Sequence, residues 1–242
     1  GIARLTTDKD TNDVGVILLD DAFQHRYVKP GINILLVDYH RLIIYDKLLP
    51  AGRLREPLSG KSRADFVIVT KCPADLKPMD IRVLTKAMSL YPYQELFFTT
   101  MEYGELFPLF KEKEDEAPEL KGHNVLLLTG IASPEEMEND IKIKCRSLKT
   151  MTFRDHHAFT PKDVEAINDA FERMESPKII VTTEKDSTRL LQTELNATIK
   201  SAIYVLPIRV RFMLSQDEEL FNNKIISYVR KNSRNSILAK GK

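Results

Sequence analysis

Short apolar runs alternate with amphipathic stretches along most of the chain. The runs of strand length, rich in Val, Ile, Leu and Phe, lie at residues 14–19, 32–37, 66–69, 96–98, 125–128, 179–181 and 203–206. Several of them end directly in Asp, Thr or Gly, as strands do when they deliver polar side chains to the carboxyl edge of a parallel sheet. This alternation predicts an α/β fold with mostly parallel sheets and helices on both faces.

Two segments carry helix-start signals. Ser133 and Pro134 precede two glutamates, which is the order of an N-cap residue, a proline at the first helical position and acids in the first turn. Thr160 and Pro161 repeat this start signal before a second helical pattern. By contrast, residues 39–60 are rich in Pro and Gly and interrupt the alternation, so we expect an irregular connection there.

The composition is that of an ordinary globular protein. Of 242 residues, 43% are hydrophobic and 29% are charged, and the net charge is +1, which gives no reason to expect a nucleic-acid partner. Cys72 and Cys145 are too few for a disulfide framework or a zinc site, and no apolar run approaches the ~18 residues of a membrane span. The C-terminal tail is locally basic, with Lys231, Arg234, Lys240 and Lys242.

Two adjacent carboxylates, Asp20 and Asp21, directly follow the apolar run 14–19. An aspartate at the end of a buried strand can hold Mg²⁺ beside the phosphates of a nucleotide, as the Walker-B strand of P-loop enzymes does. A strand end capped by an Asp turn would have the same short pattern. Here, however, the two acids are followed by Ala and then by Phe, Gln, His and Arg at positions 23–26, which is a far more specific pattern.

The segment Leu-Asp-Asp-Ala-Phe-Gln-His-Arg at positions 19–26 resembles the DDGFQHR signature of the tetraacyldisaccharide 4′-kinases, which phosphorylate a lipid A precursor. Three further segments follow in the same order as in that family. They are similar to its LPAGPLREP, FPDHHxF and VTTEKD signatures and lie at positions 49–57, 153–159 and 181–186, and the segment 129–134 also fits. Matches spread so widely along the chain are poorly explained by chance.

The sequence contains no Gly-x-x-x-x-Gly-Lys-Ser/Thr loop, whose backbone amides and lysine would cradle the nucleotide phosphates. Gly60, Lys61 and Ser62 imitate its end, but Arg55 stands where the first glycine belongs, and a strand follows instead of a helix. The 4′-kinases carry this loop upstream of their Asp-Asp signature. The resemblance therefore implies the carboxyl-terminal portion of a kinase, without cofactor-binding residues of its own.

These patterns together suggest how the chain is divided. We expect residues 1–40 to be the remainder of a P-loop-kinase-like α/β/α domain and residues 41–60 to be an inter-domain linker. Residues 61–215 would form a Rossmann-like α/β domain, and residues 216–242 a terminal helix with a basic tail. Strands 14–19 and 32–37 should leave apolar surface uncovered.

Arg55 and Glu56 lie in the Pro- and Gly-rich connection. From the residues alone, a solvated surface pair is the simpler interpretation, and such a pair contributes little stability. The resemblance implies more: Glu56 becomes a third acid near the metal, with Asp20 and Asp21, and Arg55 a substrate or phosphate contact. Two further residues of the first signature would help to bind substrate: Gln24 and His25.

The sequence Asp155-His156-His157 precedes a helix start. Paired loop histidines are often plain surface residues, but an adjacent acid can orient an imidazole for proton transfer near neutral pH. The resemblance points to His156 as the catalytic histidine, which would help to orient or deprotonate the acceptor hydroxyl, with Asp155 beside it, and makes His157 a weaker candidate. At positions 182–186, Thr183 could simply cap a helix, and a functional role for Lys185 stays open.

The resemblance thus implies a Mg²⁺- and ATP-dependent kinase of lipid A biosynthesis. It would transfer the γ-phosphoryl group to the 4′-hydroxyl of a tetraacyldisaccharide 1-phosphate. We expect a monomer working at the membrane surface, on the cytoplasmic face of the inner membrane of a Gram-negative bacterium. The alternatives are a metal-dependent phosphoesterase, which predicts two metal ions about 3.5–4 Å apart, and a non-catalytic nucleotide-fold module.

The missing phosphate-cradling loop gives a direct test on the chain itself. We expect these 242 residues alone neither to bind ATP tightly nor to turn it over, because backbone amides of that loop supply most phosphate contacts. Isothermal titration calorimetry measures this affinity. A dissociation constant in the micromolar range would contradict the expectation.

Overall fold

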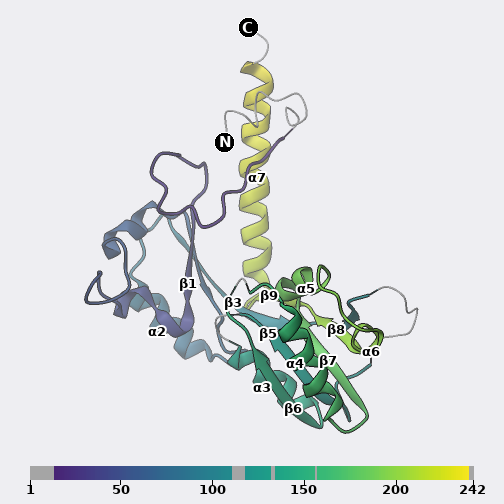
Figure 1. The fold of residues 1–242 in the computed structure, drawn as a ribbon. Helices are drawn as coiled ribbons and strands as arrows, with labels where there is room; N and C mark the ends of the chain where they lie inside the picture. Colours follow the sequence, from purple (N-terminus) through teal and green to yellow (C-terminus); the bar gives the residue numbers. More distant parts are fainter. Residues whose placement is uncertain (1–13, 111–117, 132–133, 156, 240–242) are drawn as a thin grey trace. The chain divides into compact units, whose positions relative to one another are not determined.

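The computed structural model describes residues 14–110, 118–131, 134–155 and 157–239, with side chains described as far as residue 232 (Figure 1). The chain forms two compact units. Gly1–Met101 and Val210–Lys242 together make the first, here called the split unit, and Glu102–Arg209 makes the second, the inserted unit. This division differs from the expected one.

Strand pairing explains the difference. In the split unit, β2 (Phe66–Thr70) pairs in parallel with β1 (Ile34–Asp38) on one side and with β3 (Glu95–Tyr103) on the other. Because their backbone hydrogen bonds hold these strands in one sheet, residues 61–101 belong with β1 and not with the second domain. Residues 41–60 accordingly lie inside the split unit instead of linking two domains.

The split unit has helices on both faces of its sheet, whose strand order is β1-β2-β3-β9, with β9 at Ile208–Phe212. The helix α2 (Pro78–Met88) covers one face, together with the short helices η1 (Tyr39–Arg41) and η2 (Ile43–Tyr45). The long helix α7 (Ser215–Ala239) packs on the other face through Phe221 and Ile225, and its later turns extend beyond the sheet (Figure 1). Phe221 and Ile225 of the C-terminal helix therefore complete one side of the split unit's core.

Aromatic rings make the contact between α7 and the sheet. Phe221 of α7 lies against Phe66 and Phe97, with ring centroids 5.4 and 5.6 Å apart, and Phe212 of β9 joins them. Phe97 is 1% exposed, so this cluster excludes water. Aromatic pairs at such distances contribute about 0.5–1.5 kcal/mol beyond the area they bury.

Residues 14–19 form no strand, which corrects the expectation from their apolar run. Val16 and Leu18 are 50% and 90% exposed. A strand needs a neighbour that pairs with its N–H and C=O groups, and no described strand pairs with this segment. On β1, Ile34 and Leu36 are also exposed, so apolar surface is indeed uncovered here.

The inserted unit is a three-layer α/β/α sandwich, as the alternation predicted. Its sheet has the order β4-β8-β7-β5-β6, parallel except for β4. The strands span Phe107–Pro108 (β4), Asn124–Thr129 (β5), Ser147–Thr152 (β6), Lys178–Thr183 (β7) and Ile203–Leu206 (β8). Helix α3 (Glu135–Lys144) packs on one face; α4 (Pro161–Glu172), α5 (Glu184–Leu190) and α6 (Ala197–Ala202) pack on the other.

The helix-start signals are largely confirmed. Thr160 caps α4 through a capping box with Asp163, and Pro161 is the first helical residue. Pro134 is the N-cap of α3 instead of its first residue, and Ser133 lies outside the described residues. Among the described helices, none is long and apolar enough to cross a bilayer.

The structure confirms that the segment at positions 60–62 only resembles the end of a phosphate-binding loop. Its residues Gly60, Lys61 and Ser62 lie in the short helix η3 (Leu58–Arg63), which leads into β2. The Lys61 ammonium group donates hydrogen bonds to the backbone carbonyls of Met88 and Ser89 at the end of α2. This lysine therefore closes a helix end in the described structure.

Candidate functional site

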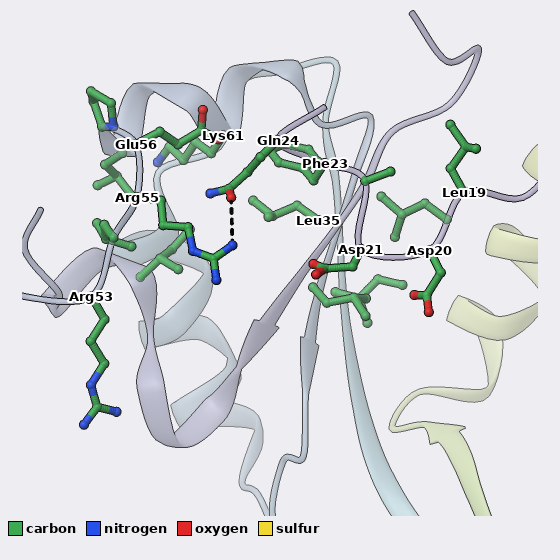
Figure 2. Close-up of a pocket in the computed structure, with 18 residues that line it drawn as sticks. Leu19, Asp20, Asp21, Phe23, Gln24, Leu35, Arg53, Arg55, Glu56 and Lys61 are labelled. Carbon is green, nitrogen blue, oxygen red and sulfur yellow. Dashed lines mark hydrogen bonds between the residues drawn. The ribbon is translucent and has the colours of Figure 1, made fainter. Parts of the chain in front are cut away.

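One cavity of about 710 Å³ in the split unit gathers residues from two distant sequence segments (Figure 2). Asp20, Asp21 and Gln24 reach it from the first signature, and Arg55 and Glu56 from the second. All five were selected from the sequence. His25, which was also selected, is exposed and does not line the cavity.

A turn presents the two aspartates. Asp21 has a φ of 47°, a left-handed conformation that Asp adopts more readily than most residues. The next turn, at residues 22–25, is closed by a hydrogen bond from the His25 amide to the Ala22 carbonyl, 2.8 Å long. In Figure 2 the Asp21 side chain points toward Gln24 and Arg55, whereas the Asp20 side chain points elsewhere. Both aspartates are exposed, so water and ligands can reach their carboxylates.

The second segment is folded tightly upon itself. Asp46 accepts hydrogen bonds from the backbone amides of Lys47 and Arg53, at 2.8 and 3.1 Å. Gly52 is needed here, because a Cβ atom at this position would lie 2.3 Å from the Lys47 carbonyl oxygen. This compact loop delivers Arg55 to the cavity, where its guanidinium group donates to Gln24 Oε1 at 3.5 Å (Figure 2).

Glu56 is held by two guanidinium groups, which the sequence did not indicate. Its carboxylate oxygens lie 2.5 Å from Arg63 Nη2 and 3.0 Å from Arg26 Nη2. The hydrogen bond from Arg63 is the main reason that the pKa of Glu56 is lowered, and Arg26 adds to it. Arg63 also lies over the Phe23 ring, 4.8 Å from its centroid. Glu56 thus fastens the Phe-Gln-His-Arg turn to η3.

The cavity holds carboxylates that suit a magnesium ion. In the part of the chain that the structure describes, no three His, Cys, Asp or Glu side chains are close enough together to hold a metal ion. Asp20 and Asp21 fit Mg²⁺ nevertheless, since this ion often takes one or two carboxylates and completes its shell with water and substrate phosphates. The Glu56 carboxylate lines the same cavity, and its oxygens are engaged by Arg26 and Arg63.

The second group of selected residues lies in the inserted unit, between β6 and α4. The Asp155 carboxylate pairs with Lys185 Nζ at 2.6 Å, and His156 lies outside the described residues. His157 is half-buried, stacks on Phe153 with ring centroids 5.2 Å apart, and lies 2.9 Å from Asp163 Oδ2 through its Nε2 atom. His157 therefore anchors the loop to α4.

The residues at 182–186 have a clear structural role. Thr183 caps α5 by accepting from the Asp186 amide, which confirms the capping interpretation. The Asp186 carboxylate is 2% exposed and accepts from the Gly130 amide at 2.9 Å and from the Thr183 hydroxyl at 2.8 Å.

Comparison with known proteins identifies relatives along nearly the whole chain. The model of the family described as tetraacyldisaccharide-1-P 4′-kinase matches residues 2–229. The tetraacyldisaccharide 4′-kinase of Phocaeicola vulgatus is 54% identical over 98% of this chain, and that of Bacteroides fragilis 48% identical over 100%. The chain spans 65% and 66% of the lengths of these two relatives.

One solved structure has a similar fold. It is the "apo" form of LpxK from Aquifex aeolicus in complex with ATP, with a TM-score of 0.51 and 24% sequence identity. The similarity covers 87% of this chain and 56% of that one. At this identity, the comparison supports the α/β fold.

Asp163 generates a prediction on stability and pH. Its pKa is lowered from 3.8 to about 2, first by hydrogen bonds from the Thr160 backbone and side chain and then by His157. Since the folded-state pKa is the lower one, the ionised carboxylate stabilises the fold above about pH 4. This stabilisation is lost as the pH falls toward about 2.

We therefore expect Asp163→Asn to lower the free energy of unfolding near neutral pH by about 1 kcal/mol, the usual effect of a lost cap. The difference from wild type should shrink as the pH approaches 2. Urea unfolding followed by circular dichroism measures it. Asp169→Asn, which alters an exposed pair with Arg173 in the same helix, is the matched control. Equal losses for both variants would contradict the assignment.

Proposed function

The chain belongs to the tetraacyldisaccharide-1-P 4′-kinase family, and from this premise we propose the activity of its gene product. This activity is transfer of the γ-phosphoryl group of ATP to the 4′-hydroxyl of a tetraacyldisaccharide 1-phosphate. One observation carries the proposal: a single cavity gathers acids, an amide and an arginine from two separate family signatures. Phosphoryl transfer depends mostly on positioning and charge stabilisation, which such a set of side chains supplies.

Asp20 and Asp21 are the proposed ligands of Mg²⁺. When bound, the ion neutralises charge on the phosphate oxygens of ATP and orients them. Two exposed carboxylates at the cavity rim suit this task, because they reach the ion without losing other partners among the interactions described for them. Their turn would hold them in place during the reaction.

Arg55 and Gln24 are proposed to bind substrate. A guanidinium group presents a planar set of donors that matches a phosphate group, and the Gln24 amide oxygen orients the guanidinium of Arg55 from the side. Glu56 contributes indirectly by holding Arg26 and Arg63 near the Phe-Gln-His-Arg turn. It could leave these partners for the metal only by breaking two ion pairs. His25 is proposed to contact substrate from outside the described cavity.

His156 is the proposed base that receives the proton of the 4′-hydroxyl, with Asp155 next to it in the sequence. The relatives come from bacteria, and the acceptor is a membrane lipid, so we propose that the reaction takes place on the cytoplasmic face of the inner membrane. We propose that the protein acts as a monomer in this reaction.

An assay with a purified acceptor tests the function directly. The complete gene product that carries this sequence should convert tetraacyldisaccharide 1-phosphate to its 4′-phosphorylated form, with one ATP consumed for each product. Mass spectrometry follows the added phosphoryl group. Loss of phosphate from the acceptor without consumption of ATP would favour the phosphoesterase alternative, and no change in either would favour the non-catalytic one.

Asp21→Asn tests the metal assignment. The substitution keeps the size of the side chain but removes the charge that offsets Mg²⁺. We expect kcat to fall by about 10²-fold or more, as it does when one electrostatic stabiliser is removed. Steady-state kinetics over a range of Mg²⁺ concentrations measures this effect. Activity within a few-fold of wild type at every concentration would assign Asp21 to the turn alone.

His156→Ala tests the proposed base. We expect kcat to fall by about 10²–10⁴-fold, the usual contribution of acid–base help, while ATP affinity stays the same. The acidic limb of the pH–rate profile should also disappear, because only a neutral imidazole accepts a proton. His157→Ala is the neighbouring control and should reduce kcat much less, since its ring is committed to Asp163. Equal losses from both would remove the special role of His156.

A further inference from the structure

Four of the five residues at positions 182–186 fasten separate segments of the inserted unit to one another. Thr182 donates to the Leu128 carbonyl of β5 at 3.1 Å, and Glu184 accepts from the Ile208 amide at the start of β9 at 3.3 Å. Asp186 holds Gly130 just after β5, and Lys185 holds Asp155 just after β6. A helix cap would need Thr183 and Asp186 alone, so capping does not explain Lys185.

The segment that carries Lys185 is held tightly against its neighbours and serves as a rigid base for this side chain. Asp186 is buried and bonded to Gly130, and a Cβ atom at Gly130 would lie 3.0 Å from Asp186 Oδ1 and 3.1 Å from the Arg154 carbonyl. The ends of β5, β6 and α5 are therefore packed closely. The Phe153 amide adds a hydrogen bond to the Thr129 carbonyl at 2.8 Å. The Lys185 side chain therefore extends from a closely packed part of the fold.

The loop after β6 is fastened at both of its described ends. On one side, Lys185 Nζ lies 2.6 Å from Asp155 Oδ1. On the other, the His157 amide donates to the Arg154 carbonyl at 3.0 Å, and the His157 ring is held by Asp163. His156 stands between these two fastened positions in the sequence.

We propose that Lys185 is a positioning residue for phosphoryl transfer: by pairing with Asp155 from a rigid base, it holds the loop of Asp155 and His157 in place. The proposal rests on the proposed function for its catalytic consequence. Both side chains of the pair are nearly half exposed, at 44% and 46%, so the pair adds little to global stability. Its effect lies in geometry, since displacement of a reacting group by about 1 Å can cost 10²-fold in rate.

Amide hydrogen exchange on the chain itself tests the positioning, without any need for activity. Lys185→Met should speed exchange of the His157 amide about two- to fivefold, the range expected from loss of one exposed ion pair. The Phe153 amide, which is bonded within the rigid base, should not change. Asp155→Asn should also accelerate this exchange, and the double variant should accelerate it by less than the product of the two single effects, because both substitutions remove the shared Lys185–Asp155 contact.

The inserted unit offers a matched control. Lys144 pairs with Asp140 at 2.7 Å and is 49% exposed, so Lys144→Met removes a comparable ion pair elsewhere. This control should leave the His157 amide unchanged, and Lys185→Arg should restore wild-type exchange. Unchanged exchange in Lys185→Met, or equal acceleration in Lys144→Met, would overturn the proposal.

Kinetics of the complete gene product test the catalytic consequence. Lys185→Met should lower kcat about tenfold at unchanged KM for ATP, Lys185→Arg should restore most of it, and Lys144→Met should have no effect. If exchange accelerates but kcat does not fall, the role in transfer is overturned. If wild type itself shows no kinase activity, the proposed function fails, and the exchange result still decides whether Lys185 holds the loop.

Discussion

The inner strands of each sheet are apolar on both faces, and this constraint determines most of the remaining architecture. A parallel strand with Val, Ile or Leu on both sides must be covered from both sides, because exposed apolar surface costs about 25 cal/mol per Å². In the inserted unit α3 covers one face and α4 to α6 the other. In the split unit α2 covers one face, and the chain must return from the inserted unit so that α7 can cover the other.

The same constraint places the polar residues. Once both faces are covered, functional side chains can stand only at strand ends and in the connections between elements. The cavity of the split unit follows this rule, because its acids and its arginine come from a turn and a loop. There, positive and negative groups are paired unevenly: Glu56 is bound by Arg26 and Arg63, whereas Asp20 and Asp21 stay exposed at the rim. The cavity thus keeps acidic oxygens accessible to a cation.

Sequence reasoning succeeded where the signal was local. The strands of the inserted unit with continuous apolar runs, such as β5 and β7, and the capping box of α4 were predictable from neighbouring residues. It failed where the outcome depends on distant segments. The run 14–19 has the composition of a strand but no described partner strand, and β6 was overlooked because an edge strand alternates polar and apolar residues. The predicted boundary between the two domains was wrong for the same reason, because strand pairing cannot be read from any one segment.

In the candidate site, too, the sequence indicated the residues of local motifs but not the contacts between distant segments. Motif resemblance selected five residues that line the cavity, yet it gave no hint of Arg63, which lies in a segment without any signature and determines the surroundings of Glu56. Likewise, the pairing of Lys185 with Asp155 joins two motifs that the sequence presents as independent. Such contacts depend on how separate segments are placed in the fold, which no spacing rule encodes.

The discontinuity of the split unit has a consequence for the order of events on the ribosome. Translation produces residues 102–209 before α7, so the inserted unit can become compact while the aromatic cluster of the split unit still lacks Phe212 and Phe221. Until those rings emerge, Phe66 and Phe97 have no cover on their side of the sheet. The nascent chain therefore carries an open apolar face while residues 98–220 are being added, and such a face is the kind of surface that chaperones bind.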